Sequence, residues 1–263
     1  MDNMATLDIE RLKKMSADDL SALFSVGSDN RAEAIKLSAQ AGFADAQAIY
    51  GQMLLDGDGV DSDPVQAIRW FRKAAGQDHA MAINMIGRCY DLGWGVEVDK
   101  ARAAQWFKAA ADRGLDWGQY NLATLLALGQ GIAEDKPAAL ELFRKAAAQG
   151  NAKALNFIGS FYEDGWVVDR DMETAARYYA EAAQGGDFRG CFNHARMLID
   201  AGNVDDALDW LAQTGKTATP AFIEKAAAWL SASGDSRLAS TGVAALHGRC
   251  MAPRAAGVKG NPS

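Results

Sequence analysis

Hydrophobic positions recur along the chain at a fixed spacing of 36 residues, and polar and glycine positions recur with them. A bulky column holds Trp70, Trp106, Leu142 and Tyr178, each followed by an aromatic residue. A small column holds Gly51, Gly87, Ala123 and Gly159. An acidic column holds Asp63, Asp99, Asp135 and Asp171. No insertion or deletion interrupts the spacing, so the pattern indicates an internal repeat of a structural unit.

Each repeat predicts two helices joined by a tight turn. In the first repeat we expect helices at residues 44–55 and 64–76, with a glycine-rich turn between them. Glycine suits this turn because it adopts positive φ without strain, and Pro64 suits the start of the second helix, where a missing N–H costs nothing. One hairpin buries too little surface to be stable alone. The pattern therefore predicts an all-α fold, an α/α solenoid of stacked helix-turn-helix repeats.

The most complete repeat lies at residues 82–111 and reads A-x-x-x-I-G-x-x-Y-x-x-G-x-G-V-x-x-D, followed by A-x-x-W-F-x-x-A-A. It resembles the Sel1-like repeat (SLR) family of the tetratricopeptide-repeat superfamily. The G-x-G-V turn is specific to this branch, and the resemblance covers residues 44–187. It implies a right-handed superhelix whose concave face is lined by the first helix of each repeat, and a scaffold for protein–protein interaction.

The flanking segments keep only parts of the pattern. We expect an N-terminal segment at residues 1–15, a degenerate helical repeat at 16–43, four repeats at 44–187 and a degenerate fifth repeat at 188–218. Capping helices are expected at 219–250, with the first one opening at Pro220, and a tail rich in Gly, Ala and Pro at 251–263. Terminal repeats commonly depart from the consensus because one of their faces meets water.

Composition and charge narrow the classes of partner and the cellular compartment that we expect. The net charge of -7 and pI near 5.0 argue against a nucleic-acid partner, which requires clustered Lys and Arg. No apolar run approaches the ~18 residues of a membrane span. Because no export signal is evident and the cysteines form a sparse, odd set, we expect a bacterial-type protein of the reducing cytoplasm. The pattern of two cysteines per repeat, found in secreted members of the family, is absent.

The resemblance implies that positions 2, 5, 9 and 12 of each first helix face the concave groove. Among the residues at these positions, the candidates for partner binding are Asn84, Arg88, Trp117, Tyr120, Lys153, Asn156, Arg189, Phe192 and Arg196. Trp117 stands out because its counterparts in neighbouring repeats are not aromatic, and Trp and Arg dominate binding hot spots. The two asparagines share a column, and such amides suit the backbone of an extended peptide.

The four cations of this set suggest a basic floor within an acidic protein, and hence an acidic peptide as partner. Two plainer interpretations stay open: Trp117 and Tyr120 can pack against neighbouring helices, and the cations can form a solvated face.

Few motifs indicate chemistry. Cys191, His194, His247 and Cys250 together are the ligand set of a structural zinc site, but Cys191 and His194 fall at core-facing columns. The repeat already explains the glycines and aspartates of the turns, so no calcium or phosphate loop is needed, and we expect no cofactor.

Three functions remain. The leading hypothesis is a non-catalytic scaffold that binds a peptide or partner protein in the groove. The second is an accessory enzyme, or a binder of a small molecule or cell-wall fragment, that uses the same groove. The third is a structural, oligomerising part of a larger complex.

Overall fold

In the computed structural model, residues 8–12, 15, 19, 23, 25 and 30–248 are described, and they fall into two compact units, Met1–Gln149 and Gly150–Ser263. The elements of unit 1 are α1 (Ile9–Leu12), α3 (Arg31–Gln40), α4 (Ala44–Asp56), α5 (Pro64–Ala75), α6 (Ala80–Leu92), α7 (Lys100–Asp112), α8 (Asp116–Leu128) and α9 (Lys136–Ala148). Those of unit 2 are α10 (Ala152–Asp164), α11 (Met172–Gln184), α12 (Phe188–Asp200), α13 (Val204–Thr217), α14 (Pro220–Ser231), the π-helix η1 (Leu238–Gly242) and α15 (Val243–Leu246). The described residues include no strand.

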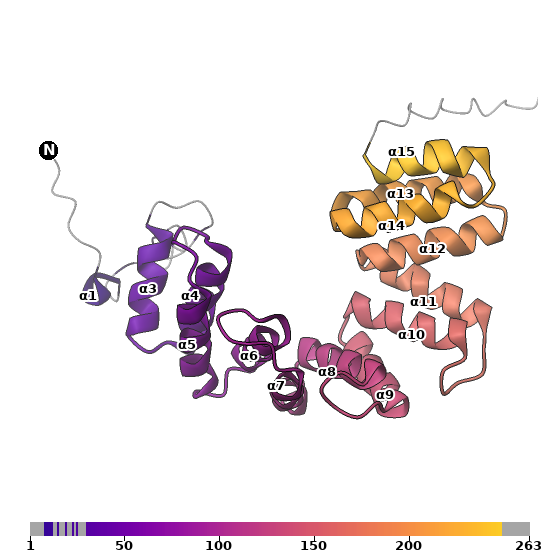
Figure 1. Cartoon of the computed structure of the whole chain (residues 1–263). Helices are drawn as coiled ribbons and strands as arrows, with labels where there is room; N and C mark the ends of the chain where they lie inside the picture. The colour runs from indigo at the N-terminus through magenta and orange to yellow at the C-terminus, as the bar shows by residue number, and fades with distance from the viewer. Residues whose placement is uncertain are drawn as a thin grey trace, which may run out of the picture. The chain divides into compact units, whose positions relative to one another are not determined.

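Unit 1 is a stack of three helical hairpins, α4/α5, α6/α7 and α8/α9, with α3 packed on the first of them (Figure 1). The second residue of each bulky pair fills the interior: Phe71, Phe107 and Phe143 are buried to 2% exposure or less. Because each phenylalanine sits at the same place in its repeat, the three hairpins bury one continuous row of aromatic rings, as expected of a solenoid.

Two recurring residues determine where the helices begin and end. The acidic column caps the second helices: the Asp63 carboxylate accepts from the Gln66 backbone N–H at 2.9 Å, and Asp99, Asp135 and Asp171 make the equivalent bonds. A left-handed glycine ends each first helix of the four complete repeats, as at Gly57, where φ is 72°.

The small column brings the two helices of a hairpin together. A Cβ atom at Gly51 would lie 2.7 Å from the Phe71 ring, and one at Gly87 would lie 2.6 Å from the Phe107 ring. Only glycine allows the aromatic ring to lie directly against the backbone of the first helix. In the third repeat Ala123 occupies the column, so the packing there tolerates one methyl group.

Unit 2 contains the hairpins α10/α11 and α12/α13, followed by α14, η1 and α15. The last two pack on α13, and all three pack on one another. Its C-terminal core includes Leu211, Leu230 and Leu246, all fully buried. Thr219 caps α14 ahead of Pro220, where the sequence places the start of that helix. Both units are thus stacks of helical hairpins, which confirms the all-α, α/α solenoid. Most of the first part of the expected repeat at 16–43 lies outside the described residues, as do Cys250 and the expected tail at 251–263.

Candidate functional site

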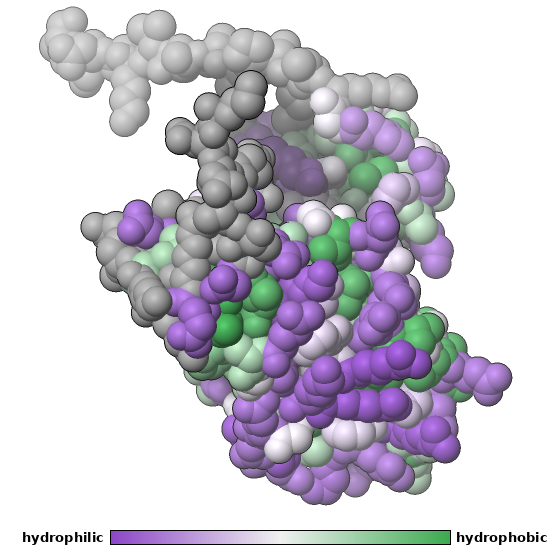
Figure 2. Space-filling model, turned by 90° about the vertical axis from the view of Figure 1, so that its left-hand side faces the viewer, coloured by the Kyte–Doolittle hydropathy of each residue, from purple (hydrophilic) through white to green (hydrophobic). Residues whose placement is uncertain are grey.

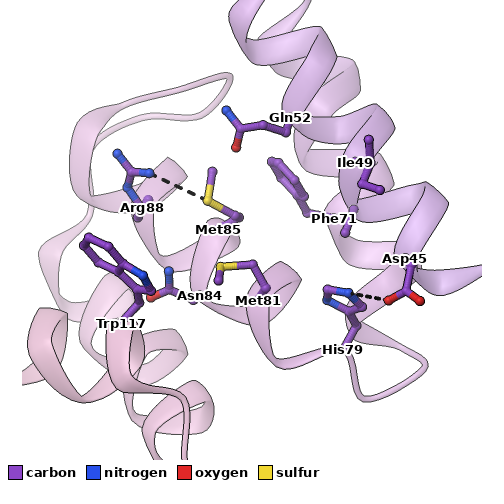
Figure 3. A pocket seen from close by; sticks show the side chains of 11 residues that line it. Asp45, Ile49, Gln52, Phe71, His79, Met81, Asn84, Met85, Arg88 and Trp117 are labelled. Atoms are coloured by element: carbon purple, nitrogen blue, oxygen red, sulfur yellow. Dashed lines mark hydrogen bonds and ion pairs between the residues drawn. The ribbon is translucent and has the colours of Figure 1, made fainter. Parts of the chain in front are cut away.

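Unit 1 contains a hollow of about 530 Å³ between the first helices α4, α6 and α8. This volume lies in the range that binds a small molecule or a few side chains of a peptide. Of the nine candidates from the sequence, Asn84, Arg88 and Trp117 line it. Figure 3 shows Arg88 and Trp117 on one side of the hollow and Ile49 on the opposite side.

The walls of the hollow are apolar and open to solvent. The Phe71 ring is fully buried at its floor, and Met85 is 5% exposed. Above them Ile49, Met81 and Trp117 are 45%, 39% and 37% exposed. Large apolar side chains gathered around a cavity in this way provide surface that a ligand can bury. Figure 2 shows the face that lies on the left in Figure 1. On this face hydrophobic side chains reach the surface in small patches between hydrophilic ones.

Neighbouring aromatic rings fix the position of Trp117. Its ring meets Tyr120 edge to face, with centroids 6.0 Å apart, and Tyr120 in turn packs on the buried Phe143 ring at 6.0 Å. Tyr120 is therefore a support for Trp117 and does not itself line the hollow. The two interpretations of Trp117 are compatible, because one part of its surface packs on Tyr120 while more than a third stays exposed.

Arg88 is the cation of the hollow. Its guanidinium lies 4.8 Å from the centroid of the Trp94 ring, and its Nη1 lies 3.8 Å from the Met85 sulfur. Both contacts orient the side chain without neutralising its charge. Within the part of the chain that the structure describes, no carboxylate forms an ion pair with Arg88.

The structure uses Asn84 and Asn156 to join neighbouring repeats. Asn84 is 2% exposed, and its Oδ1 accepts a hydrogen bond of 2.9 Å from Asn121 Nδ2 on the next first helix. Asn156 is 6% exposed and accepts in the same way from Asn193, at 2.8 Å. The amide oxygen that we expected to be offered to a peptide is thus already bonded in both asparagines.

His79 and Asp45 form a polar pair at one end of the hollow, with Nε2 and Oδ1 3.1 Å apart (Figure 3). The other ring nitrogen, Nδ1, accepts from the Ala82 backbone N–H and caps α6. Because Nδ1 accepts, the ring proton is on Nε2, which donates a hydrogen bond to Asp45 Oδ1. Both nitrogens of His79 therefore have structural bonds, and the pair is not arranged as a general base.

A second hollow, of about 430 Å³, lies within unit 2 between α10, α12 and α14. Its aromatic wall consists of Phe192, whose ring meets those of Phe222 and Trp229 edge to face at 5.5 and 5.6 Å. Arg189 lies over the Phe188 ring at 4.5 Å. Arg189, Phe192 and Arg196 were expected from the repeat pattern. Phe222, Lys225 and Trp229 also line this hollow but were not expected, because α14 lies beyond the repeats.

Arg196 is fully engaged in this second hollow. Its Nη2 lies 2.9 Å from both carboxylate oxygens of Glu163, and its Nε donates to Asn193. The Tyr179 hydroxyl donates to the same carboxylate at 2.5 Å. Burial, together with the bond to Glu163, raises the pKa of Tyr179 well above its usual value. This network is closed, since each of its charges is paired.

Lys153 lines neither hollow. It is half-buried on α10. Burial raises the pKa of the Asp187 carboxyl, and the positive charges of Arg189 and Lys153 offset this rise only in part. Arg88 belongs to unit 1, and Lys153, Arg189 and Arg196 belong to unit 2. The four predicted cations thus have four different surroundings.

Two residues of the zinc ligand set considered from the sequence, Cys191 and His194, make contacts within unit 2. Cys191 is buried, with its thiol donating to the Ala183 carbonyl, and the His194 ring packs edge to face on Trp210 at 5.2 Å. Burial lowers the pKa of His194. Among the described residues no three His, Cys, Asp or Glu side chains are grouped to hold a metal ion. None of the described helices is both long and apolar enough to cross a bilayer.

Comparison with solved structures supports the fold. A Sel1 repeat protein from Oxalobacter formigenes is 23% identical with a TM-score of 0.66, over 81% of this chain and 96% of that one. A protective antigen with an SLR fold from uropathogenic Escherichia coli is 28% identical with a TM-score of 0.62, over 82% of this chain but only 48% of its own. An immunity protein from Pseudomonas aeruginosa is 21% identical with a TM-score of 0.53, over 75% of this chain and 74% of that one.

A search among curated proteins finds no match. The family model of the Sel1 repeat, by contrast, matches four times, at residues 44–79, 80–115, 118–151 and 152–187. These matches cover more than half of the chain and coincide with the hairpins α4/α5 to α10/α11. The chain therefore belongs to the Sel1 repeat family.

Proposed function

We propose that this protein is a non-catalytic scaffold that binds a peptide segment of a partner protein in the hollow of unit 1. Sel1 repeats generally serve as protein–protein interaction scaffolds and are generally not catalytic. The observation that carries the proposal is the exposed apolar wall of Ile49, Met81 and Trp117 around an open hollow. Stacking of the repeats does not need these exposed surfaces, so they are available to a ligand.

The chemistry around the hollow favours binding over catalysis. Its one histidine caps a helix, its asparagine joins two repeats, and its arginine is stacked on an aromatic ring. No nucleophile stands beside a base among the residues that line it. What the hollow offers is a shaped apolar surface with one cation at its rim, which suits recognition of a side chain.

We further propose that the protein is bacterial and acts in the cytoplasm. The three relatives described above are bacterial. Cys89 and Cys191 are buried free thiols, which is typical of a reducing compartment. We also propose that residues 16–43 and 188–218 are degenerate repeats and that the helices at residues 219–250 cap the C-terminal end of the repeat array.

The experiment that tests the proposal uses Trp117 and a matched control. Peptides selected from a random phage-displayed library on the immobilised full chain would be measured by calorimetry against Trp117→Ala and Trp166→Ala. The control is well matched because both tryptophans are 37% exposed, but Trp166 lies in a turn of unit 2. We expect Trp117→Ala to weaken binding by about 30-fold, as for a hot-spot residue, and Trp166→Ala to leave it unchanged. Failure to select any peptide, or equal effects of the two changes, would overturn the proposal.

A further inference from the structure

We infer that the hollow of unit 1 selects a segment in which a large apolar side chain stands next to a carboxylate, and that Arg88 binds this carboxylate. The inference rests on the proposed function and names the chemical class of its ligand. It assigns the apolar wall to anchoring and Arg88 to specificity. Two observations carry it. Arg88 has no counter-charge among the described residues, and Arg196, which occupies the same position three repeats later, has one.

The surroundings of Arg88 leave its charge available. The guanidinium is half-buried at the rim, stacked on Trp94 and oriented by the Met85 sulfur. A ligand that filled the apolar hollow would remove further water from this guanidinium. Covering a charge without a partner is costly, so a neutral ligand is penalised here. A carboxylate offsets that cost and forms a charge-assisted hydrogen bond with an already oriented donor.

Arg196 shows what the same position looks like when the protein supplies the acid itself. The residue that receives Arg196 Nη2 is Glu163, at position 12 of the preceding first helix. At the corresponding position before Arg88 stands Leu55. The neighbour that accepts from the arginine side chain also differs, because Asn193 corresponds to Met85. Where Arg196 has Glu163 and Asn193, Arg88 thus has Leu55 and Met85, and no carboxylate among the described residues pairs with it.

One of these two differences adds to the apolar character of the hollow, because Met85 lines it. Leu55 packs against the hydrophobic core of unit 1, whereas Met85 belongs to that core and lines the hollow together with Ile49 and Met81. Methionine side chains adapt their shape to different apolar groups. The hollow therefore defines the charge of its ligand more strictly than the shape of its apolar side chain.

The test follows from this comparison. The full chain and three variants, Arg88→Gln, Leu55→Glu and Leu55→Gln, would be panned separately against the same random phage-displayed peptide library. Leu55→Glu supplies Arg88 with an internal acid in the manner of Glu163, whereas Leu55→Gln has nearly the same size and no charge. Thermal melting by circular dichroism would confirm that each variant folds, and Arg88→Gln gives an independent test if Leu55→Glu does not.

We expect the wild type and Leu55→Gln to select peptides in which Asp or Glu adjoins a large apolar residue. Arg88→Gln and Leu55→Glu should lose that acidic preference and bind the wild-type peptides about 10- to 100-fold more weakly, as expected for loss of a hydrogen bond between charged groups. Replacing the acid of the peptide by its amide should cost the same factor with the wild type and little with Arg88→Gln.

Two results would overturn the inference and leave the proposed function standing. One is that the wild type selects apolar peptides sensitive to Trp117→Ala but without acidic residues. The other is that the acidic preference persists in both Arg88→Gln and Leu55→Glu. Selection of no peptide, or only of peptides insensitive to Trp117→Ala, would overturn the proposed function and the inference with it.

Discussion

Replacement of Gly95 by alanine should destabilise unit 1 strongly, because this glycine packs directly against the backbone of the preceding repeat. Gly95 lies in the turn between α6 and α7, with φ of +69°. A Cβ atom there would lie 2.5 Å from the Pro64 carbonyl carbon and 2.8 Å from the Val65 nitrogen. These atoms form the start of α5 in the preceding repeat, and they are backbone atoms that cannot rotate away.

Gly57 supplies a matched control for this change. It has nearly the same φ, +72°, but the nearest atom to its Cβ would be 3.7 Å away. Alanine in the left-handed region costs about 1–2 kcal/mol, partly offset by a gain of about 0.4–1 kcal/mol from a stiffer unfolded chain. Gly57→Ala should therefore cost about 1 kcal/mol. Gly95→Ala adds overpacking against backbone, about 1–3 kcal/mol more, for a total of about 2–4 kcal/mol.

The assay is urea unfolding of the full chain followed by circular dichroism, with the free energy of unfolding compared among the wild type and the two variants. Hydrogen exchange at α5 and α6 would show that the loss falls on unit 1. Equal losses for Gly95→Ala and Gly57→Ala would refute the reasoning, because the cost would then come from backbone conformation alone and not from contact between repeats.

Three further predictions concern buried groups. Asn121→Ala should cost about 1–3 kcal/mol in urea unfolding, because it leaves the buried Asn84 oxygen without its donor; a change below 0.5 kcal/mol would contradict the bridging role. Asp187→Asn should raise the melting temperature at neutral pH. Burial raises the pKa of Asp187 above its usual 3.8, so the folded state holds this proton more tightly than the unfolded state does. The stability of the wild type therefore falls as the pH rises through that raised pKa. The gain should vanish when the pH falls below 3.8, and a gain that is constant with pH would exclude this cause. Cys89, whose pKa burial raises to about 11, and the buried Cys191 should resist alkylation at pH 8 until urea unfolds the protein; peptide mapping that finds either one modified in the folded protein would show that its unit opens.

Local features of the fold followed from the sequence because each has a local cause. The prediction of a helix at Pro64 is confirmed, since Asp63 caps it and the proline needs no hydrogen bond at that place. The small residue at Gly51 has an equally local cause, because the Phe71 ring lies against its backbone. Such features depend on residues within one repeat, and the 36-residue spacing shows the capping aspartate in all four repeats and the glycine in three of them.

Features that depend on two repeats did not follow. The sequence shows Asn84 and Asn156 in one column, but their partners lie one column further along, 37 residues away. An alignment of repeats compares equal columns and does not reveal a bond between unequal ones. Likewise Arg88 and Arg196 are equivalent in the sequence pattern, and only the three-dimensional neighbours show that one is paired with Glu163 and the other is not.

The measurement that tests the central claim most directly is a crystal structure of the full chain with a selected peptide. We expect the peptide to place an apolar side chain between Ile49, Met81 and Trp117 and a carboxylate within hydrogen-bonding distance of the Arg88 guanidinium. A peptide bound elsewhere on the protein, with the hollow between α4, α6 and α8 empty, would contradict that claim.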